Sequence, residues 1–259
     1  MVAMAAVVGL AAGTVPGSAA ARPPQQAPPP AETARNTAPV DLTGYWVSIV
    51  TEDWLWRMLT PPIGDFASVP LNDEGQLVGL TWDLAQDEIN GDLCKPYGVG
   101  NIMRMPGRVH ITWENDDTLR IDTDAGEQTR LLHFGGPPPP AGERTWQGQS
   151  VASWERSVVA PPDGQDGRGV SWSSLKVVTS HFRAGYLRLN GVPYSEDASI
   201  TEYLDRHTEP DGSEWFTVTT IIDDPTYLTQ RFITSSSFKR EPDGAKWTPT
   251  PCIIDPPLT

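Results

Sequence analysis

The sequence predicts an all-β fold, a lipocalin-like antiparallel barrel or strongly curved sheet of about nine strands with short helical insertions. Short runs with a two-residue hydrophobic period alternate with turn residues along most of the chain, as expected of half-buried strands. The chain contains 26 Pro and 23 Gly, which interrupt helices and favour turns. It also contains 10 Trp, whose large apolar surfaces can compensate for a hydrophobic content of only 38%.

The predicted strands are separated by turn sequences rich in Asp, Asn, Gly and Pro. Residues 108–114 show the pattern clearly, because Val109, Ile111 and Trp113 alternate with polar or charged residues. Together with the two runs that follow, this segment predicts a three-stranded meander over 108–134. The full set of predicted strands is 44–50, 108–114, 119–123, 129–134, 145–155, 173–182, 198–208, 215–222 and 227–240.

Little helix is expected. Residues 81–89 can form two helical turns with Thr81 as the N-cap, and residues 53–59 can form one short turn. Two Pro-rich segments, 135–141 and 160–169, are predicted to be exposed loops within a single domain.

The N-terminal part of the chain is predicted to direct export. Residues 3–12 are apolar and small, and Ser18-Ala19-Ala20-Ala21 offers a cleavage site, so residues 1–21 fit a signal peptide; a disordered Ala-rich tail is the alternative. Residues 22–40 are rich in Pro, Ala and Gln and are predicted to be a disordered linker. Residues 41–259 are then one domain, located in the periplasm or outside the cell.

The formal net charge is −14 and the sequence pI is about 4.6. Such an acidic surface repels nucleic-acid phosphates and anionic lipids, so the expected partner is a small-molecule ligand or substrate. No later segment is long and apolar enough for a transmembrane helix. In an exported protein the two cysteines, Cys94 and Cys252, favour a disulfide, although two free buried thiols would give the same sequence.

Gly44-Tyr45-Trp46, at the start of the first predicted strand, resembles the G-x-W motif of lipocalins. The resemblance implies that Trp46 closes the floor of a barrel. It also implies that a basic residue of the last strand covers the Trp, and Arg231, Lys239 and Arg240 are the candidates.

A second resemblance covers approximately residues 41–252. It is carried by Ser174-Leu175-Lys176-Val177-Val178-Thr179, Gly191-Val192-Pro193-Tyr194-Ser195-Glu196, Thr201-Glu202-Tyr203 and Asp224-Pro225. These segments are similar to those of an uncharacterised family of exported bacterial all-β proteins. The resemblance implies a fold and a location rather than a reaction.

The sequence contains none of the familiar catalytic signatures: no G-x-S-x-G, H-E-x-x-H, C-x-x-C, P-loop or dinucleotide fingerprint. Its four His residues show no metal-ligand spacing. No metal or cofactor is therefore expected.

Glu202 is the leading candidate for acid–base chemistry. Glu202 shares a strand face with Ile200 and Leu204, because every second side chain of a strand points the same way. It is therefore expected inside the barrel. A buried carboxylate needs a partner or has a raised pKa, and a raised pKa suits a general acid or base. The alternative is a structural pair with Arg206 or with an Arg on a neighbouring strand.

Four further residues are candidates for proton transfer beside Glu202. His133 and His181 share strand faces with apolar residues and could point into a cavity. Tyr194 and Tyr203 lie close to Glu202 in the sequence. For either His, a hydrogen-bonded structural role is the alternative.

The segment after the first strand combines aromatic and charged residues. Trp54 and Trp56 could stack on a planar or sugar-like ligand while Asp53 and Arg57 bind its polar groups, or the two Trp residues could simply cover the end of the core. The candidate ligand-binding residues are Trp46, Asp53, Trp54, Trp56, Arg57 and Arg206.

Two functions therefore remain open. The favoured one is binding of a small, largely apolar or aromatic molecule in a barrel cavity. The alternative is a cofactor-independent acid–base enzyme, such as an isomerase, cyclase, lyase or hydrolase, that uses the same cavity.

Overall fold

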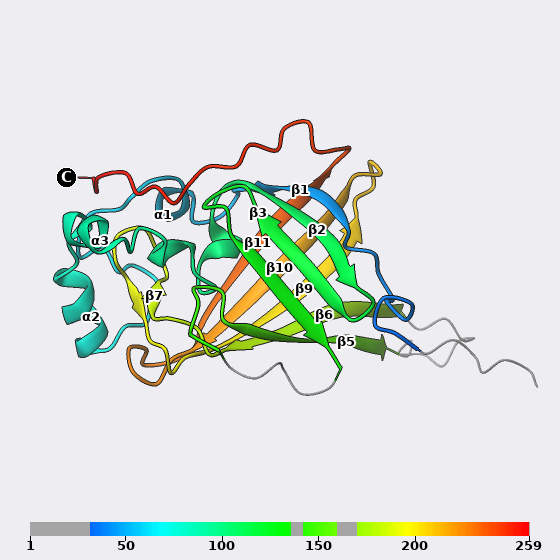
Figure 1. Ribbon diagram of the computed structural model, residues 1–259, viewed down its shortest axis with the longest axis horizontal. Helices are drawn as coiled ribbons and strands as arrows, with labels where there is room; N and C mark the ends of the chain where they lie inside the picture. Colours follow the sequence, from blue (N-terminus) through cyan, green and yellow to red (C-terminus); the bar gives the residue numbers. More distant parts are fainter. Residues whose placement is uncertain (1–31, 136–141, 160–169, 259) are drawn as a thin grey trace, which may run out of the picture. The chain divides into compact units, whose positions relative to one another are not determined.

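The computed structural model describes residues 32–135, 142–159 and 170–258. They form a closed barrel of nine strands in the spatial order β1-β11-β10-β9-β6-β5-β4-β3-β2 (Figure 1). The predicted all-β barrel is confirmed. The barrel strands are β1 (Gly44–Ile49), β2 (Arg108–Asn115), β3 (Thr118–Thr123), β4 (Thr129–Phe134), β5 (Gln149–Val159), β6 (Val170–Ser180), β9 (Ser199–Thr208), β10 (Glu214–Asp223) and β11 (Phe232–Glu241).

Neighbouring barrel strands are antiparallel except at one place, where β4 and β5 run parallel and pair Leu132 with Ser150. The strand predicted at 145–155 begins later, at Gln149. Gly148 explains the late start because its φ of +61° interrupts extended backbone, and a Cβ there would lie 2.5 Å from the Ser180 carbonyl oxygen.

The helices gather at one end of the barrel, beside the β7–β8 hairpin (Figure 1). The predicted helix at 81–89 begins after Asp83 rather than Thr81, because the Asp83 carboxylate accepts hydrogen bonds from the Ala85 and Gln86 amides. A helix at 73–80 was not expected from the sequence. The elements of this end are α1 (Trp54–Met58), α2 (Asp73–Leu80), α3 (Leu84–Asn90), the 3₁₀ helices η1 (Lys95–Tyr97) and η2 (Ile102–Arg104), β7 (Gly185–Tyr186) and β8 (Pro193–Tyr194).

The barrel interior is filled by large side chains around Trp46, which is fully buried. The Trp46 ring lies 4.9 Å from that of Phe216, which stacks on Phe238 at 4.7 Å. The Trp46 indole donates a hydrogen bond to the Leu42 carbonyl. Among the basic residues suggested for the last strand, Arg240 covers Trp46, with its guanidinium 5.2 Å from the ring centre.

Residues 32–40 pack against the barrel, although the sequence places them in a disordered linker. The Ala34 amide donates to the Asp117 carboxylate at 2.8 Å, and the Trp154 indole donates to the Ala34 carbonyl at 3.1 Å. Val40 also packs on the core. The predicted signal peptide, 1–21, and the rest of the linker lie outside the described residues.

The last segment, residues 242–258, crosses the outside of the barrel towards its helical end (Figure 1) and is called the C-terminal strap below. The Thr250 amide donates to the Asp124 carbonyl at 2.8 Å. A disulfide joins Cys94 to Cys252, as predicted. Near the end of the strap, the Leu258 amide donates to the Thr60 carbonyl. None of the helices in the described part of the chain could cross a membrane.

Candidate functional site

Glu202 lies inside the barrel as expected, but its partner is Arg130 on β4. The Arg130 Nη1 donates to Glu202 Oε1 at 3.0 Å, and Nη2 donates to Oε2. Of the two structural alternatives, the pair with Arg206 is wrong, and the pair with an Arg of another strand is formed, although β4 is not adjacent to β9. Arg206 instead pairs with Glu214 and donates to the Asp41 carbonyl. A carboxylate that is buried and bound bidentately by a guanidinium fits a structural role.

The proposed proton carriers do not gather around Glu202. Tyr203 points to the outer face of β9, where Lys176 lies over its ring. His133 also faces outward, because the buried positions of β4 are the alternate ones. His181 follows β6 in a turn, and its Nε2 lies 2.8 Å from the Gly142 carbonyl. Tyr194 is fully buried, and burial raises the pKa of its hydroxyl. The interior positions predicted for His133 and His181 are wrong.

The segment 53–57 does not form an aromatic platform. Trp54 is 61% exposed, while one face of the Trp56 ring is covered by the Arg188 guanidinium 4.9 Å away. Asp53 pairs with Arg104 at 3.0 Å. Arg57 is buried beneath the segment and pairs with Glu52. The charged side chains of this segment therefore form ion pairs with other residues of the protein.

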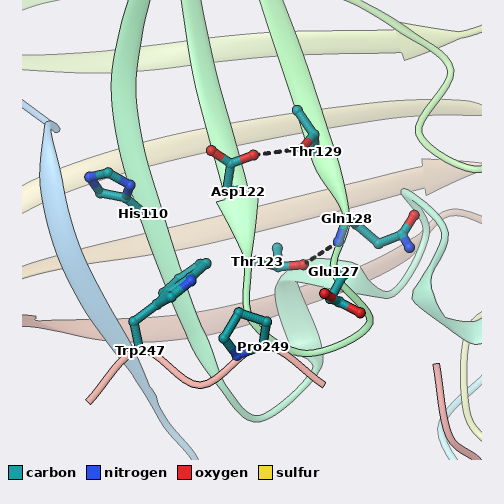
Figure 2. Close-up of a pocket in the computed structure, with 8 residues that line it drawn as sticks. All are labelled: His110, Asp122, Thr123, Glu127, Gln128, Thr129, Trp247 and Pro249. Carbon is teal, nitrogen blue, oxygen red and sulfur yellow. Dashed lines mark hydrogen bonds between the residues drawn. The ribbon is translucent and has the colours of Figure 1, made fainter. Parts of the chain in front are cut away.

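Because the barrel interior is packed, the expected ligand site inside it has no support. A pocket of about 240 Å³ instead lies on the outer surface, between the strap and strands β2 to β4 (Figure 2). Trp247 and Pro249 of the strap form one side of it in Figure 2. The lining residues are His110, Asp122, Thr123, Glu127, Gln128, Thr129, Trp247 and Pro249.

An aromatic group forms one wall of this pocket. His110 of β2 lies opposite Tyr45 of β1 in the strand register, and the two rings stack at 3.9 Å with an angle of 2° between their planes. The Trp247 ring meets Tyr45 edge-on at 5.9 Å and lies 6.2 Å from His110. Burial lowers the pKa of His110, although the nearby Asp122 carboxylate acts in the opposite direction. The neutral form of His110 is therefore favoured.

Polar groups of the β3–β4 hairpin form the facing side (Figure 2). Asp122 accepts hydrogen bonds from the Thr129 hydroxyl at 2.6 Å and from Arg120 Nε at 2.7 Å, which fixes its carboxylate. The backbone amide of Gln128 donates a hydrogen bond to the Thr123 hydroxyl at 3.2 Å.

The loop residue Glu127 has a φ of +49°, in the left-handed region that non-glycine residues rarely occupy. Within the described residues its carboxylate has no hydrogen-bond or ion-pair partner, and the same holds for the Trp247 indole N–H and the His110 ring nitrogens. The pocket thus combines one aromatic face with free donors and acceptors.

Sequence reasoning missed this pocket. The alternation of Val109, Ile111 and Trp113 with polar residues puts His110 on the polar face of its strand, but nothing in that pattern marks it as a binding residue. The strap supplies Trp247, and no strand or helix pattern marks that segment. The available signal was Cys252, because a disulfide there brings the C-terminal segment back to the barrel.

Comparison of the chain with protein-family models, curated proteins and solved structures finds no match.

Proposed function

We propose that the protein binds a small hydroxylated ring compound, such as a sugar, in the pocket of Figure 2, and that it does so outside the cytoplasm. The observation that carries the proposal is the combination of the Trp247 ring with unused hydrogen-bonding groups of both kinds. The apolar face of a sugar ring can pack on an indole, while its hydroxyls both donate and accept hydrogen bonds. Glu127 supplies acceptors, and Trp247 and His110 supply donors.

The size and charge of the pocket support this ligand class. A volume of about 240 Å³ is below the roughly 300–1,000 Å³ of typical drug-sized sites, so it suits a single ring. The lining residues include two carboxylates and no Lys or Arg. Because Asp122 is paired with Arg120, it is the Glu127 carboxylate that would repel an anionic ligand. A large apolar ligand would leave the polar side of the pocket without hydrogen bonds, which is costly.

Location outside the cytoplasm is supported by the disulfide, because such bonds persist in oxidising compartments. The signal-like N-terminal sequence points the same way. The acid–base enzyme alternative has less support, because Glu202, Tyr203, His133 and His181 do not converge.

The test is calorimetric titration of the full chain with a panel of neutral mono- and oligosaccharides. We expect one or more to bind, with affinity falling at least tenfold in Trp247→Ala because the stacking face is lost. Trp172→Ala is the matched control, because Trp172 is 50% exposed and belongs to a different surface on β6. Equal affinity in the wild type and Trp247→Ala, or no sugar binding at all, would reject the proposal.

Two further measurements test the ligand class. Binding of a neutral sugar should change little between low and high NaCl, whereas a charged ligand would be screened. Glu127→Gln keeps the shape of the side chain and removes its charge. We expect it to weaken binding by roughly tenfold at most, because a hydrogen bond to a charged group is replaced by a neutral one.

A further inference from the structure

Three buried arginines lie together at the helical end of the barrel, separate from the pocket of Figure 2. Arg57 belongs to α1, Arg104 to η2, and Arg188 to the β7–β8 connection. Arg57 Nε donates to the Arg104 carbonyl at 2.8 Å, and the charge of Arg104 acts on both of the other guanidiniums. Each of the three side chains is more than nine-tenths buried. Like charges brought together out of water need compensation.

The nearby carboxylates compensate only part of this charge. Glu52 pairs with Arg57, and Asp53 pairs with Arg104 at 3.0 Å. Arg188 has no ion pair with any carboxylate in the described residues. Its guanidinium donates to the Ala67 carbonyl and lies over the Trp56 ring. Arg188 is only 1% exposed, and the charges of Asp53 and Asp65 act on it without forming an ion pair.

Several donors of this cluster are unused. In the described part of the chain, Nε and Nη1 of both Arg104 and Arg188 are buried and lack a hydrogen-bond partner. Burial and the charge of Arg104 lower the pKa of Arg188 to about 10, so it remains charged at neutral pH. A buried charged donor that makes no hydrogen bond is costly, and an anion that accepts from it would remove that cost.

We propose that Arg104 and Arg188, with Arg57 behind them, form a binding site for a phosphate-type oxyanion. A tetrahedral oxyanion presents acceptors in several directions, which suits guanidiniums that come from three separate elements. The carboxylates that pair with Arg57 and Arg104 face solvent, since the Glu52 and Asp53 side chains are each about a third exposed. Asp53 contacts Arg104 directly and is the group that the anion would displace.

The test uses the full chain and inorganic phosphate, with thermal unfolding followed in phosphate and in NaCl of equal ionic strength. Phosphate should raise the unfolding midpoint with increasing concentration, because it binds the folded state. Arg188→Gln should abolish that rise and lower the phosphate affinity measured by calorimetry at least tenfold. Arg231→Gln, which removes an exposed surface charge paired with Asp223, should leave the rise unchanged.

Two further results keep the proposal testable if a variant changes stability. Without phosphate, Arg188→Gln should be as stable as the wild type or more stable, because it removes an unpaired buried charge. Asp53→Asn should bind phosphate more tightly than the wild type, since Arg104 is released and Asn tolerates the left-handed backbone of this position. The proposal is wrong if phosphate stabilises no more than NaCl, or if it stabilises the wild type and Arg188→Gln equally.

Discussion

Replacing Glu202 by Gln tests whether the buried ion pair is structural. The substitution keeps the size of the side chain and removes its charge. Arg130 then lacks a counter-ion in a position where its side chain is almost completely buried. Removing one partner of a buried pair costs about 3–5 kcal/mol, because the remaining charge is uncompensated. The expected loss is therefore a large part of the stability of a typical domain.

The measurement is urea unfolding followed by Trp fluorescence, with the disulfide intact. With an m-value towards the upper end of the usual range of about 1–3 kcal/mol/M, the midpoint should fall by roughly 1–2 M. Glu155→Gln is the matched control: it removes a carboxylate from the surface pair with Lys176 on adjacent strands, where an exposed pair contributes at most about 1 kcal/mol.

The double variant Glu202→Leu with Arg130→Met separates pairing from packing. Replacing both charges by apolar groups of similar size should restore most of the stability, because no buried charge is left. A Glu202→Gln variant as stable as Glu155→Gln would refute the reasoning. It would mean that the Glu202 charge is not needed by Arg130 and would return Glu202 to the list of catalytic candidates.

Three other perturbations have expected outcomes. Replacing Cys94 and Cys252 by Ser removes a crosslink between residues 158 positions apart, which should cost about 5 kcal/mol in the chain-entropy model; an unchanged thermal midpoint would contradict this. The lowered pKa of His110 means that the unfolded chain takes up a proton first, so this contribution to stability is present above pH 6.5 and falls below it; an NMR titration giving a pKa of 6.5 or higher would contradict the sign. Gly191→Ala should cost about 3 kcal/mol or more, because φ is +77° and a Cβ would lie 2.2 Å from an indole carbon. Gly212→Ala, with a φ of +82° and open space around it, should cost only about 1–2 kcal/mol, and equal costs would contradict the steric argument.

The strands and the closed barrel could be predicted because both depend on local patterns. The period of two and the turn residues locate β4 at its observed bounds, Thr129–Phe134. The parallel pairing of β4 with β5 could not be predicted in the same way, since strand partners and their directions are not part of a local pattern. Helix α2 was missed because Gly75 and Gly79 weaken a helical pattern. Both are required by close packing: a Cβ at Gly79 would lie 2.7 Å from the Phe66 ring.

The orientation of side chains was harder to predict than the strands. Alternation shows that Leu131 and His133 share a face, but it does not show which face of β4 is inside. Leu132 and Phe134 favour the opposite face, which is the buried one, but that face also carries Arg130, while Leu131 is 39% exposed. Arg130 can occupy the interior because Glu202, 72 positions later, neutralises it. Such a long-range pair leaves no trace in the local pattern.

The candidate ligand site lies outside the barrel because the interior is filled by side chains. The sequence favoured a ligand in a barrel cavity, but Trp46 and its neighbours fill the interior, as side chains do in small barrels. Arg130 and Glu202 also lie in the interior, where they pair with each other. A pocket then forms where a second layer covers the outer face of the strands, and the strap is that layer. Trp247 is held in position by the backbone pairing at Thr250 and by the disulfide at Cys252. The position of this pocket residue therefore depends on how the C-terminal strap is attached to the rest of the domain, and not on the strand pattern of the barrel.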